Sequence, residues 1–476
     1  METDVDLVSI ITARHRFLHQ FQYWYRNLTV PQFTVLTGIL VIVVGTGVLA
    51  TPLCSTEQVG LWNAFFTVTS AITVTGLSVI DVGKDLTFAG QVTLAALIIT
   101  GGLGLMAITT FLQGFVQGRS GLRQRLDKGR TLDEFGVGGI GPTFHKILLT
   151  ATCLMGVGTI ILYFFGFNDI GHPGERLWAA MFHAISAYNN AGFGLWSESL
   201  MGYQSNLVVN SVIAALVVTG GMGWRVVNEV WTNRSKGFNM RRFSLHTRIV
   251  VRSTFLLIVL GTAGLLFTEQ FAPDGILQSL SGLERLQVTF FQSITTRTAG
   301  FNTIPLSIET VSDAGLLLMI ILMFIGASPG GTGGGIKTTT FALLLGATRS
   351  TLERRQEVVI RRRVVPGELI LKAVAIVLAS ALFVLLMTLL LGLGPTRGGA
   401  SVQTSYSFLE KLFTCVSAFG TVGLDMGVTG SLSRWGQLVL VIGMFVGRLG
   451  IMLLLAALYG SRPPARVGFP REDVYL

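Results

Sequence analysis

FTVTSAITVTG at residues 66–76 is the first of four stretches with one spacing, a phenylalanine followed ten residues later by a glycine. The other three are FHAISAYNNAG at 182–192, FFQSITTRTAG at 290–300 and FTCVSAFGTVG at 413–423. Each stretch lies between two long apolar segments. A crossing segment, a re-entrant loop and a second crossing segment, repeated around an axis, are how proteins line an ion-selective pore. The repeat therefore predicts that one chain closes such a ring alone.

The composition indicates a membrane protein, because 50% of the residues are hydrophobic, only 13% are charged and the mean hydropathy is +0.63. A soluble enzyme is thereby excluded as the first interpretation. The N-terminal residues contain no continuous apolar core of a cleaved signal and are expected to lie at the membrane interface. Cys54, Cys153 and Cys415 are far apart and form no CxxC pair, so they indicate neither a disulfide framework nor a metal site.

The apolar segments fall in pairs around the four stretches: 33–50 and 88–116, 147–167 and 207–227, 253–267 and 314–347, and 370–393 and 438–458. Most approach the roughly 20 residues that a helix needs to cross the hydrocarbon core. We expect an all-α polytopic membrane protein with eight transmembrane helices. Four repeats of helix, re-entrant pore loop and helix (M1-P-M2) would surround one pore with pseudo-fourfold symmetry.

The expected organisation begins with an N-terminal segment at 1–32 and repeat 1 at 33–118. Repeat 2 with its preceding basic linker occupies 119–235. Repeat 3 occupies 236–350 and contains an intramembrane gate loop at 326–339. Repeat 4 occupies 351–460, and a C-terminal tail follows at 461–476.

Basic residues orient the chain, because 26 of the 35 Lys and Arg residues lie in the terminal segments and in the three linkers between repeats. By the positive-inside rule, both termini are cytoplasmic and the chain is a multi-pass protein of the plasma membrane. The opposite side carries 13 acidic residues against 7 basic ones. An acidic mouth attracts cations, although ordinary solvated loops give the same pattern. Because this orientation accounts for the basic residues, the net charge of +10 does not indicate nucleic-acid binding.

The residues around the four glycines are the candidate selectivity filter. A filter replaces the water shell of an ion with backbone carbonyls, and glycine tolerates the backbone angles and close approach that this needs. The Ser/Thr-rich residues before each glycine suit a short helix whose partially negative C-terminal end points at the ion. The candidate K⁺ ligands are the backbone carbonyls of Val74, Thr75, Gly76, Leu77, Asn190, Ala191, Gly192, Phe193, Thr298, Ala299, Gly300, Phe301, Thr421, Val422, Gly423 and Leu424.

A glycine-rich tract interrupts the second segment of repeat 3. Glycine costs about 1 kcal/mol relative to alanine inside a helix and proline about 3 kcal/mol, so the segment must break there. Irregular backbone at membrane depth is tolerated only where protein buries it or where it lines a cavity, so we predict a gate; a passive linker is the alternative. The predicted gate comprises Gly326, Ala327, Ser328, Pro329, Gly330, Gly331, Thr332, Gly333, Gly334, Gly335, Ile336, Lys337 and Thr338.

Arg448 is assigned to the same gate. It stands where the matching segments of repeats 1 and 2 have Gly102 and Gly221. A charge at mid-membrane costs about 2.5–3.5 kcal/mol on insertion scales. Arg448 either has a structural role, as an ion pair for which Glu229 is the nearest candidate carboxylate or as a backbone clamp, or it is a positive charge that holds back cations below the filter. Arg297, three residues before the third glycine, is assigned to bracing its loop.

The four loops and the tract at 326–339 resemble the Trk/Ktr/HKT superfamily of potassium translocation subunits, over nearly the whole chain. Eight spans resemble the Ktr membrane subunit more than the longer Trk subunit. The resemblance implies K⁺ uptake, a homodimer with one pore per subunit, and a cytosolic nucleotide-binding ring of the RCK type that gates the pore. Plant members that prefer Na⁺ have a serine at the position of Gly76, so the resemblance favours K⁺, with some passage of Na⁺.

Several alternatives stay open or are set aside. A proton- or sodium-coupled symporter with the same filter is the main rival, since such carriers also have repeats and broken helices. A membrane-embedded enzyme built on His183 is remote, because no catalytic partner accompanies it. The glycines at 136–141 and at 330–335 lack the strand that nucleotide-binding motifs require, so no nucleotide is expected on this chain. The basic linkers would meet either anionic membrane lipids or an acidic partner.

Overall fold

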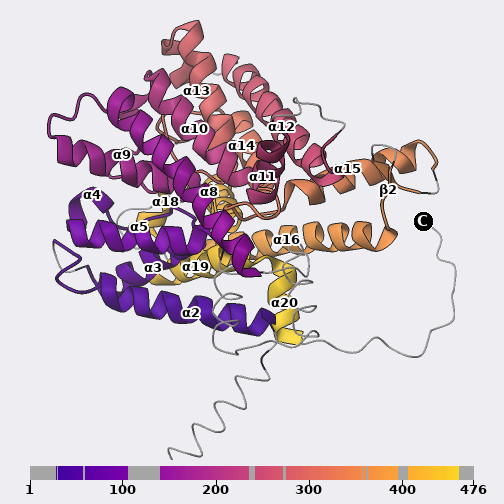
Figure 1. Cartoon of the computed structure of the whole chain (residues 1–476), viewed down its shortest axis with the longest axis horizontal. Coiled ribbons are helices and arrows are strands. Elements are labelled where there is room, and N and C mark those ends of the chain that lie inside the picture. The colour runs from indigo at the N-terminus through magenta and orange to yellow at the C-terminus, as the bar shows by residue number, and fades with distance from the viewer. Residues whose placement is uncertain are drawn as a thin grey trace, which may run out of the picture.

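The computed structural model describes residue 28 and residues 30–56, 59–104, 140–234, 242–271, 275–355, 357–360, 363–394 and 406–459. Helices dominate these residues (Figure 1). The sheet in the described part is one antiparallel pair of two-residue strands, β1 (Val359–Ile360) and β2 (Arg363–Val364). Nearly all of the expected N-terminal segment, most of the linker before repeat 2 and the C-terminal tail lie outside the described residues.

Four long helices begin the four expected repeats: α2 (Val30–Leu49), α8 (Ile140–Ile161), α12 (Leu245–Gln270) and α16 (Gly367–Leu393). The π-helix η1 (Leu162–Gly166) continues α8. These four are long and apolar enough to cross a membrane. Large apolar side chains such as Leu40, Phe255 and Leu382 are exposed on them, as lipid-facing surfaces require.

A short helix follows each long one: α3 (Leu61–Thr73), α9 (Pro173–Tyr188), α13 (Gly282–Thr295) and α17 (Phe408–Gly420). At 13 to 16 residues they are shorter than a span. Their starts are encoded locally, by capping boxes at Ser281 and Ser407 and by Pro173 in the first turn of α9. Each short helix ends just before one of the four glycine loops.

The closing helices are α5 (Phe88–Gly102), α10 (Leu207–Met222), α14 (Asp313–Phe324) and α19 (Arg434–Leu449). Within the described residues, three of them continue after a break, as α11 (Trp224–Asn233), α15 (Thr338–Leu352) and α20 (Ile451–Tyr459); the end of the expected segment 88–116 lies outside the described residues. Only the break between α14 and α15 is predicted from the sequence. The segments 207–227 and 438–458 also break, at Gly223 and Gly450, whose φ angles of 87° and 82° no continuing helix can contain. The helices α10 and α11 meet at a bend of 102°.

Small elements complete the connecting loops: α4 (Val82–Asp85), η2 (Met201–Tyr203), η5 (Ile276–Ser279) and α18 (Val428–Ser431). The main helices are arranged cyclically. The short helices α3, α9 and α17 each pack on both longer helices of their own repeat, and α13 packs mainly on α12. Each closing helix also contacts the next short helix: α5 with α9, α10 with α13, and α14 with α17. The contact between α19 and α3 completes the circle. The four short helices therefore lie at the centre of one ring.

Glycines bring the closing helices onto the ends of the short helices. A Cβ atom added to Gly101 would lie 2.1 Å from the carbonyl oxygen of Ile72. The same construction gives 1.9 Å between Gly220 and the Tyr188 oxygen, and 1.8 Å between Gly447 and the Phe419 oxygen. Each of these carbonyls belongs to the residue four before a loop glycine. A side chain at these positions would therefore push the closing helix away from the loop.

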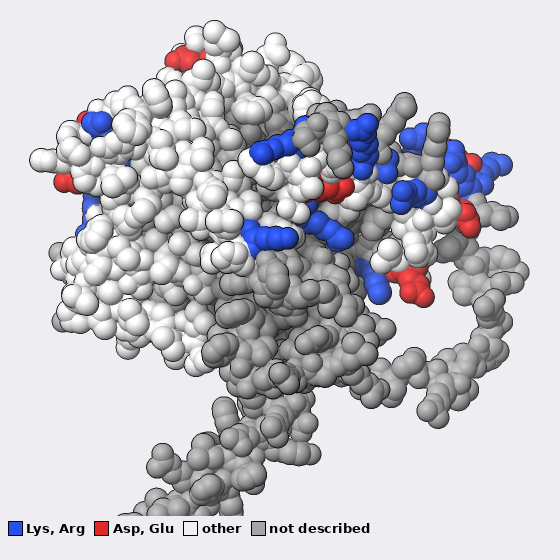
Figure 2. All heavy atoms as spheres, viewed as in Figure 1, with Lys and Arg blue, Asp and Glu red and all other residues white. Residues whose placement is uncertain are grey.

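The charges gather at the ends of the helices. Figure 2 shows Lys and Arg concentrated over α11, α15 and the β1–β2 pair, at one end of the long helices of Figure 1. The described basic residues of this end include Arg225, Arg234, Arg248, Arg349, Arg354, Arg355, Arg363 and Lys372. Between this end and the opposite one the visible surface is almost free of charge. An uncharged band between two polar ends is the surface expected of a membrane protein.

The glycine contact on the first short helix gives a test of the fold. We expect Gly101→Ala to reduce the yield of folded protein and its thermal stability, because the new methyl group must displace the Ile72 backbone; overpacking of this kind costs about 1–3 kcal/mol. The matched control is Gly47→Ala in α2, where a Cβ meets nothing within 4 Å. Gel filtration and melting in detergent measure both variants. Equal behaviour of the two would contradict the contact.

Candidate functional site

The four glycine loops have one backbone conformation. A residue with positive φ ends each short helix or follows it closely, and the glycine two positions later again has positive φ. The first set is Val74 (56°), Asn190 (58°), Thr298 (70°) and Thr421 (51°); the second is Gly76 (91°), Gly192 (70°), Gly300 (78°) and Gly423 (93°). Four non-glycine residues in the left-handed region cost about 1–2 kcal/mol each, so the surrounding packing must impose this shape.

The loops meet one another in a closed ring. A Cβ added to any of the four glycines would lie 2.2 to 2.9 Å from a carbonyl oxygen of the next loop. The pairs are Gly76 with Ala191, Gly192 with Ala299, Gly300 with Val422 and Gly423 with Thr75. Each of these oxygens belongs to the residue just before a loop glycine. Four such carbonyls are therefore gathered around one point, which is the arrangement that can coordinate a dehydrated cation.

The side chains beside the glycines are packed away from the ring. All of the flanking candidates, from Val74 to Leu424, are at most 2% exposed. Gly76, Gly192 and Gly423 are instead partly exposed. The surface that the ring presents is therefore backbone, so no side chain of the candidate set is available to bind an ion there.

Hydrogen bonds hold the loops, and the third loop is held differently. Ser70 Oγ accepts from Gly76 N at 3.0 Å, and Ser417 Oγ accepts from Gly423 N at 3.1 Å. The equivalent position in the third loop is Ile294, which has no hydroxyl. There Thr295 Oγ1 donates to the carbonyl of Phe301 at 2.7 Å instead. The four loops thus share one backbone conformation, but different side chains hydrogen-bond to them.

The predicted gate tract forms a compact loop between α14 and α15. A parallel bridge between Ile325 and Ile336 closes its base, and Ala327 N donates to the Gly334 carbonyl at 3.2 Å. Lys337 Nζ donates to the carbonyl of Gly333 at 2.8 Å. A helix, α14, precedes the tract, so the strand that a P-loop needs is replaced by a helix.

The tract touches three of the four filter loops. Thr332 Oγ1 donates to Asn190 Oδ1 at 3.1 Å, and Thr421 Oγ1 accepts from Gly334 N at 2.8 Å. A Cβ added to Gly333 would lie 2.1 Å from Thr298 Oγ1. The three side chains belong to the left-handed residues that come before the filter glycines. The tract therefore lies against the ring, on the side from which the short helices enter it.

Arg448 fixes the tract to the first repeat. Its guanidinium donates to the carbonyls of Thr332 and Gly101, and to the carbonyl of Gly102 at 3.4 Å. The carboxylate of Glu229 instead accepts from Ser244 and Thr247. Glu229, the nearest candidate carboxylate, is therefore not the partner of Arg448, because each group is bonded by closer neighbours. The backbone-clamp alternative describes the observed contacts.

Sequence reasoning missed the helix ends that hold the tract. The carbonyls of Gly220 and Gly221 accept from Thr332 N and Ser328 N at 3.1 and 3.0 Å, and the Tyr188 carbonyl, 3.2 Å from Thr332 Oγ1, shares the hydroxyl proton with Asn190 Oδ1. Gly101 and Gly220 open the Gly-Gly-x-Gly motifs of repeats 1 and 2. The repeated motif could therefore have pointed to these positions. Its spacing does not show that the motif of repeat 1 bonds Arg448 while the motif of repeat 2 bonds the gate tract.

Other candidates lie apart from the ring. His183 is fully buried, with Nδ1 2.8 Å from the Ala179 carbonyl and its ring stacked on Trp196 at 4.3 Å, a packing role. Asp81 precedes α4 in the loop after the first glycine and accepts a hydrogen bond from Ser197 of repeat 2. Burial raises the pKa of Asp81, but bonds from Ser197 and from backbone N–H groups outweigh it and leave the pKa below its ordinary value. In the described part, no group of His, Cys, Asp or Glu could hold a metal.

Comparison with known proteins gives consistent matches over nearly the whole chain. Residues 7–459 match the TrkH family, described as a cation transport protein. The chain is 33% identical over 452 residues to Ktr system potassium uptake protein B of Bacillus subtilis, covering 95% of this chain and 97% of that protein. It is 34% identical over 450 residues to the protein of the same name from Vibrio alginolyticus, covering 93% and 94%.

Two further proteins extend the comparison. The potassium/sodium uptake protein NtpJ of Enterococcus hirae is 30% identical over 456 residues, covering 95% of this chain and 98% of that protein. Among solved structures, the potassium transporter TrkH from Vibrio parahaemolyticus has a TM-score of 0.72 at 19% identity, covering 91% of this chain and 86% of that one. This last likeness shows that the fold is shared.

The clamp at Arg448 predicts a measurable loosening of the tract. Arg448→Gln removes the charged donors to Thr332 and Gly101, so we expect faster amide hydrogen exchange at residues 326–338. The expected increase is about tenfold, since a hydrogen bond to a charged group contributes about 1.5–3 kcal/mol. Arg434→Gln, at the exposed start of the same helix, is the control. Unchanged exchange in the tract would show that Arg448 does not hold it.

Proposed function

Because the chain belongs to the TrkH family of cation transport proteins, we propose that it takes up potassium ions through the ring of four glycine loops. The observation that carries this proposal is the cyclic contact of each loop glycine with the carbonyl of the next loop. The named relatives are potassium uptake proteins, which agrees with a site built of carbonyls. The family transports cations, so the chain is not an enzyme.

The proposed architecture is eight spans in four M1-P-M2 repeats around one pore. The four long helices supply the first spans, the four closing helices with their continuations supply the second, and the short helices point their C-terminal ends at the ion. The cyclic contacts among the short and closing helices support this arrangement. The basic end with α11, α15 and β1–β2 would face the cytoplasm in the plasma membrane.

The proposed filter is short. Each loop offers one glycine-centred turn, so fewer carbonyl rings surround the ion than in the five-residue filters of K⁺ channels. We therefore expect one dominant K⁺ site and measurable passage of Na⁺. That a relative of this chain is a potassium/sodium uptake protein agrees with incomplete discrimination, and Na⁺-dependent uptake belongs to the same proposal.

The proposed gate is the tract between α14 and α15 together with Arg448. The tract lies against three filter loops and is held by Arg448 and by the ends of α10, so an ion leaving the ring would meet it. Opening requires these bonds to break. A cytosolic nucleotide-binding ring, docked on the basic end, would supply that free energy, and the working unit would be a homodimer with one pore per chain.

Flux in reconstituted vesicles tests the transport proposal. We expect radiolabelled K⁺ to enter vesicles that hold the purified chain with a cytosolic partner, and Na⁺ to enter severalfold more slowly. The K⁺ ring should reject most Na⁺ because its carbonyls are spaced for the larger ion. Vesicles without protein are the control. Equal entry of the two ions, or entry of neither, would overturn the proposal.

The ring itself can be tested with one methyl group. Gly76→Ala places a Cβ 2.4 Å from the Ala191 carbonyl, so we expect K⁺ flux per folded chain, counted after gel filtration, to fall more than tenfold. The matched control is Gly427→Ala, at a φ of 80° with nothing within 4 Å, which has the same backbone strain without the ring contact. If both variants lost the same flux, strain alone would explain the result.

A further inference from the structure

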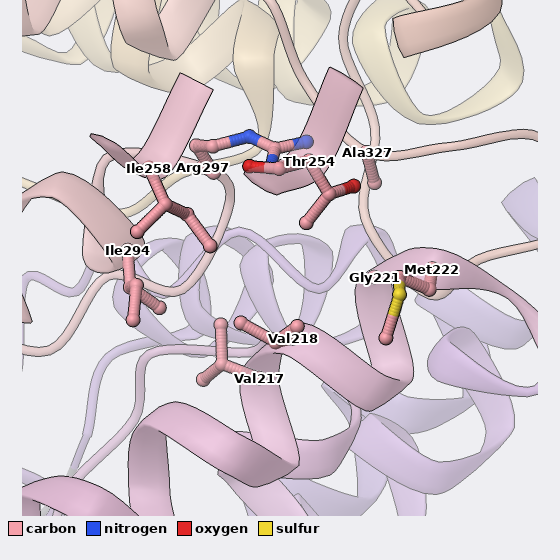
Figure 3. A pocket seen from close by; sticks show the side chains of 9 residues that line it. All are labelled: Val217, Val218, Gly221, Met222, Thr254, Ile258, Ile294, Arg297 and Ala327. Atoms are coloured by element: carbon pink, nitrogen blue, oxygen red, sulfur yellow. The ribbon is translucent and has the colours of Figure 1, made fainter. Parts of the chain in front are cut away.

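A small cavity lies behind the third filter loop, between α10, α12 and α13 (Figure 3). It leaves about 20 Å³ for the centre of a water-sized particle, and one such particle needs about 10–15 Å³. Arg297 and Thr254 lie together at one end of the cavity, and Val217 and Val218 lie at the other (Figure 3). Ala327 of the gate tract also lines it. The cavity thus adjoins both the filter and the gate.

Arg297 is a buried cation with weak and incomplete hydrogen bonding. It is 8% exposed, and its two terminal nitrogens donate to the carbonyls of Thr254 and Gly326, each at 3.4 Å. Its Nε has no hydrogen-bond partner in the described structure. None of the three ion pairs among the described residues includes it. A buried charge without an opposite charge is strongly unfavourable, so an anion bound beside Arg297 would lower the free energy of this guanidinium.

Arg448 is held differently from Arg297. Arg448 is only partly buried, and its two terminal nitrogens donate to three carbonyl oxygens. Arg448 is also absent from the lining of this cavity, whereas Arg297 lines it and has a fully buried Nε without an acceptor. The unsatisfied donor at this cavity therefore belongs to Arg297.

Thr254 supplies a second donor to the same space. Its side chain is buried at 6% exposure, and its hydroxyl has no hydrogen-bond partner in the described structure. The other two buried threonines of α12 do have partners: Thr262 Oγ1 donates to the Ile258 carbonyl at 2.8 Å, and Thr247 Oγ1 donates to the carboxylate of Glu229. The Thr254 hydroxyl and the Arg297 Nε–H are therefore two donors without acceptors, on one wall of one cavity.

We propose that this cavity binds one small monovalent anion of the halide class, held by the side chains of Arg297 and Thr254. A halide accepts hydrogen bonds from both donors and supplies the charge that Arg297 lacks. The cavity is too small for a phosphate or a carboxylate. Its remaining walls are mainly apolar, including Val217, Ile258 and Met222, and a large weakly hydrated anion tolerates such walls better than a strongly hydrated one.

The bound anion would steady the gate. Arg297 donates to the carbonyl of Gly326, the first residue of the tract, so an anion that fixes its guanidinium also fixes this contact. Removal of the anion should therefore loosen the tract and raise K⁺ flux in the absence of the activating partner. This consequence rests on the proposed function, whereas the binding of the anion does not.

Bromide binding to the purified full-length chain tests the site. We expect an anomalous bromine peak within hydrogen-bond distance of Arg297 Nε in crystals grown in sodium bromide. We also expect the melting temperature to rise saturably when bromide replaces gluconate at constant ionic strength. A featureless or bromine-free cavity, or equal melting in the two salts, would overturn the proposal and leave water as the occupant. Either result stands whether or not the chain transports K⁺.

Two variants separate ligand binding from folding. Thr254→Val removes one donor without touching the filter, so about tenfold more bromide should be needed for half of the melting shift; one charge-assisted hydrogen bond has this size. The control Thr262→Val, in the same helix, should leave that concentration unchanged. Val218→Phe should fill the cavity and abolish the bromide effect in a folded protein. If the two threonine variants responded alike, Thr254 would not be a ligand.

Discussion

The structure depends on direct contact between backbones, which glycine alone permits. The filter ring brings each loop glycine against a carbonyl of the next loop, and the closing helices bring three more glycines against the carbonyls at the ends of the short helices. A single methyl group at any of these places would have to displace backbone. Because a carbonyl ring can select an ion only when its oxygens are held at fixed spacing, these contacts couple packing to the proposed selectivity.

The third repeat departs from this scheme in three ways that belong together. Its loop has Ile294 where two others have a bonded serine, its closing segment is divided by the glycine tract, and Arg297 reaches from its loop to the first residue of that tract. The third loop is bonded within itself by Thr295, and the tract also packs against it where Gly333 meets Thr298. The tract, which is the part proposed to move, therefore contacts the filter loops directly, and this contact links the state of the gate to the shape of the ring.

The two arginines near the filter are held in different ways. Arg448 donates to carbonyls of two different repeats, while Arg297 is short of acceptors. Carbonyl dipoles lower the free energy of a guanidinium without forming an ion pair, so in the proposed function the charge of Arg448 remains as a repulsion for cations. A carboxylate beside Arg448 would remove that repulsion and would compete for the ion that the chain is proposed to transport.

The sequence by itself determined the membrane class, the four loops and the broken segment of repeat 3. Each of these depends on short-range properties: apolar length, a glycine at a fixed distance, and proline among glycines. The breaks at Gly223 and Gly450 escaped, because an isolated glycine in an apolar segment is compatible with a continuous helix. Only the positive φ required by the tertiary fold reveals them.

The tertiary structure alone decided what touches what. The cyclic order of the loops, the position of Thr332 between Asn190 and Arg448, and the cavity beside Arg297 join residues more than a hundred positions apart in several cases. Sequence reasoning left Arg448 open between an ion pair, a backbone clamp and a charge beside the pore, because spacing shows only that the charge lies inside an apolar segment. Packing brought three carbonyls within reach of Arg448 and none to the Nε of Arg297, because these distances depend on how whole helices meet.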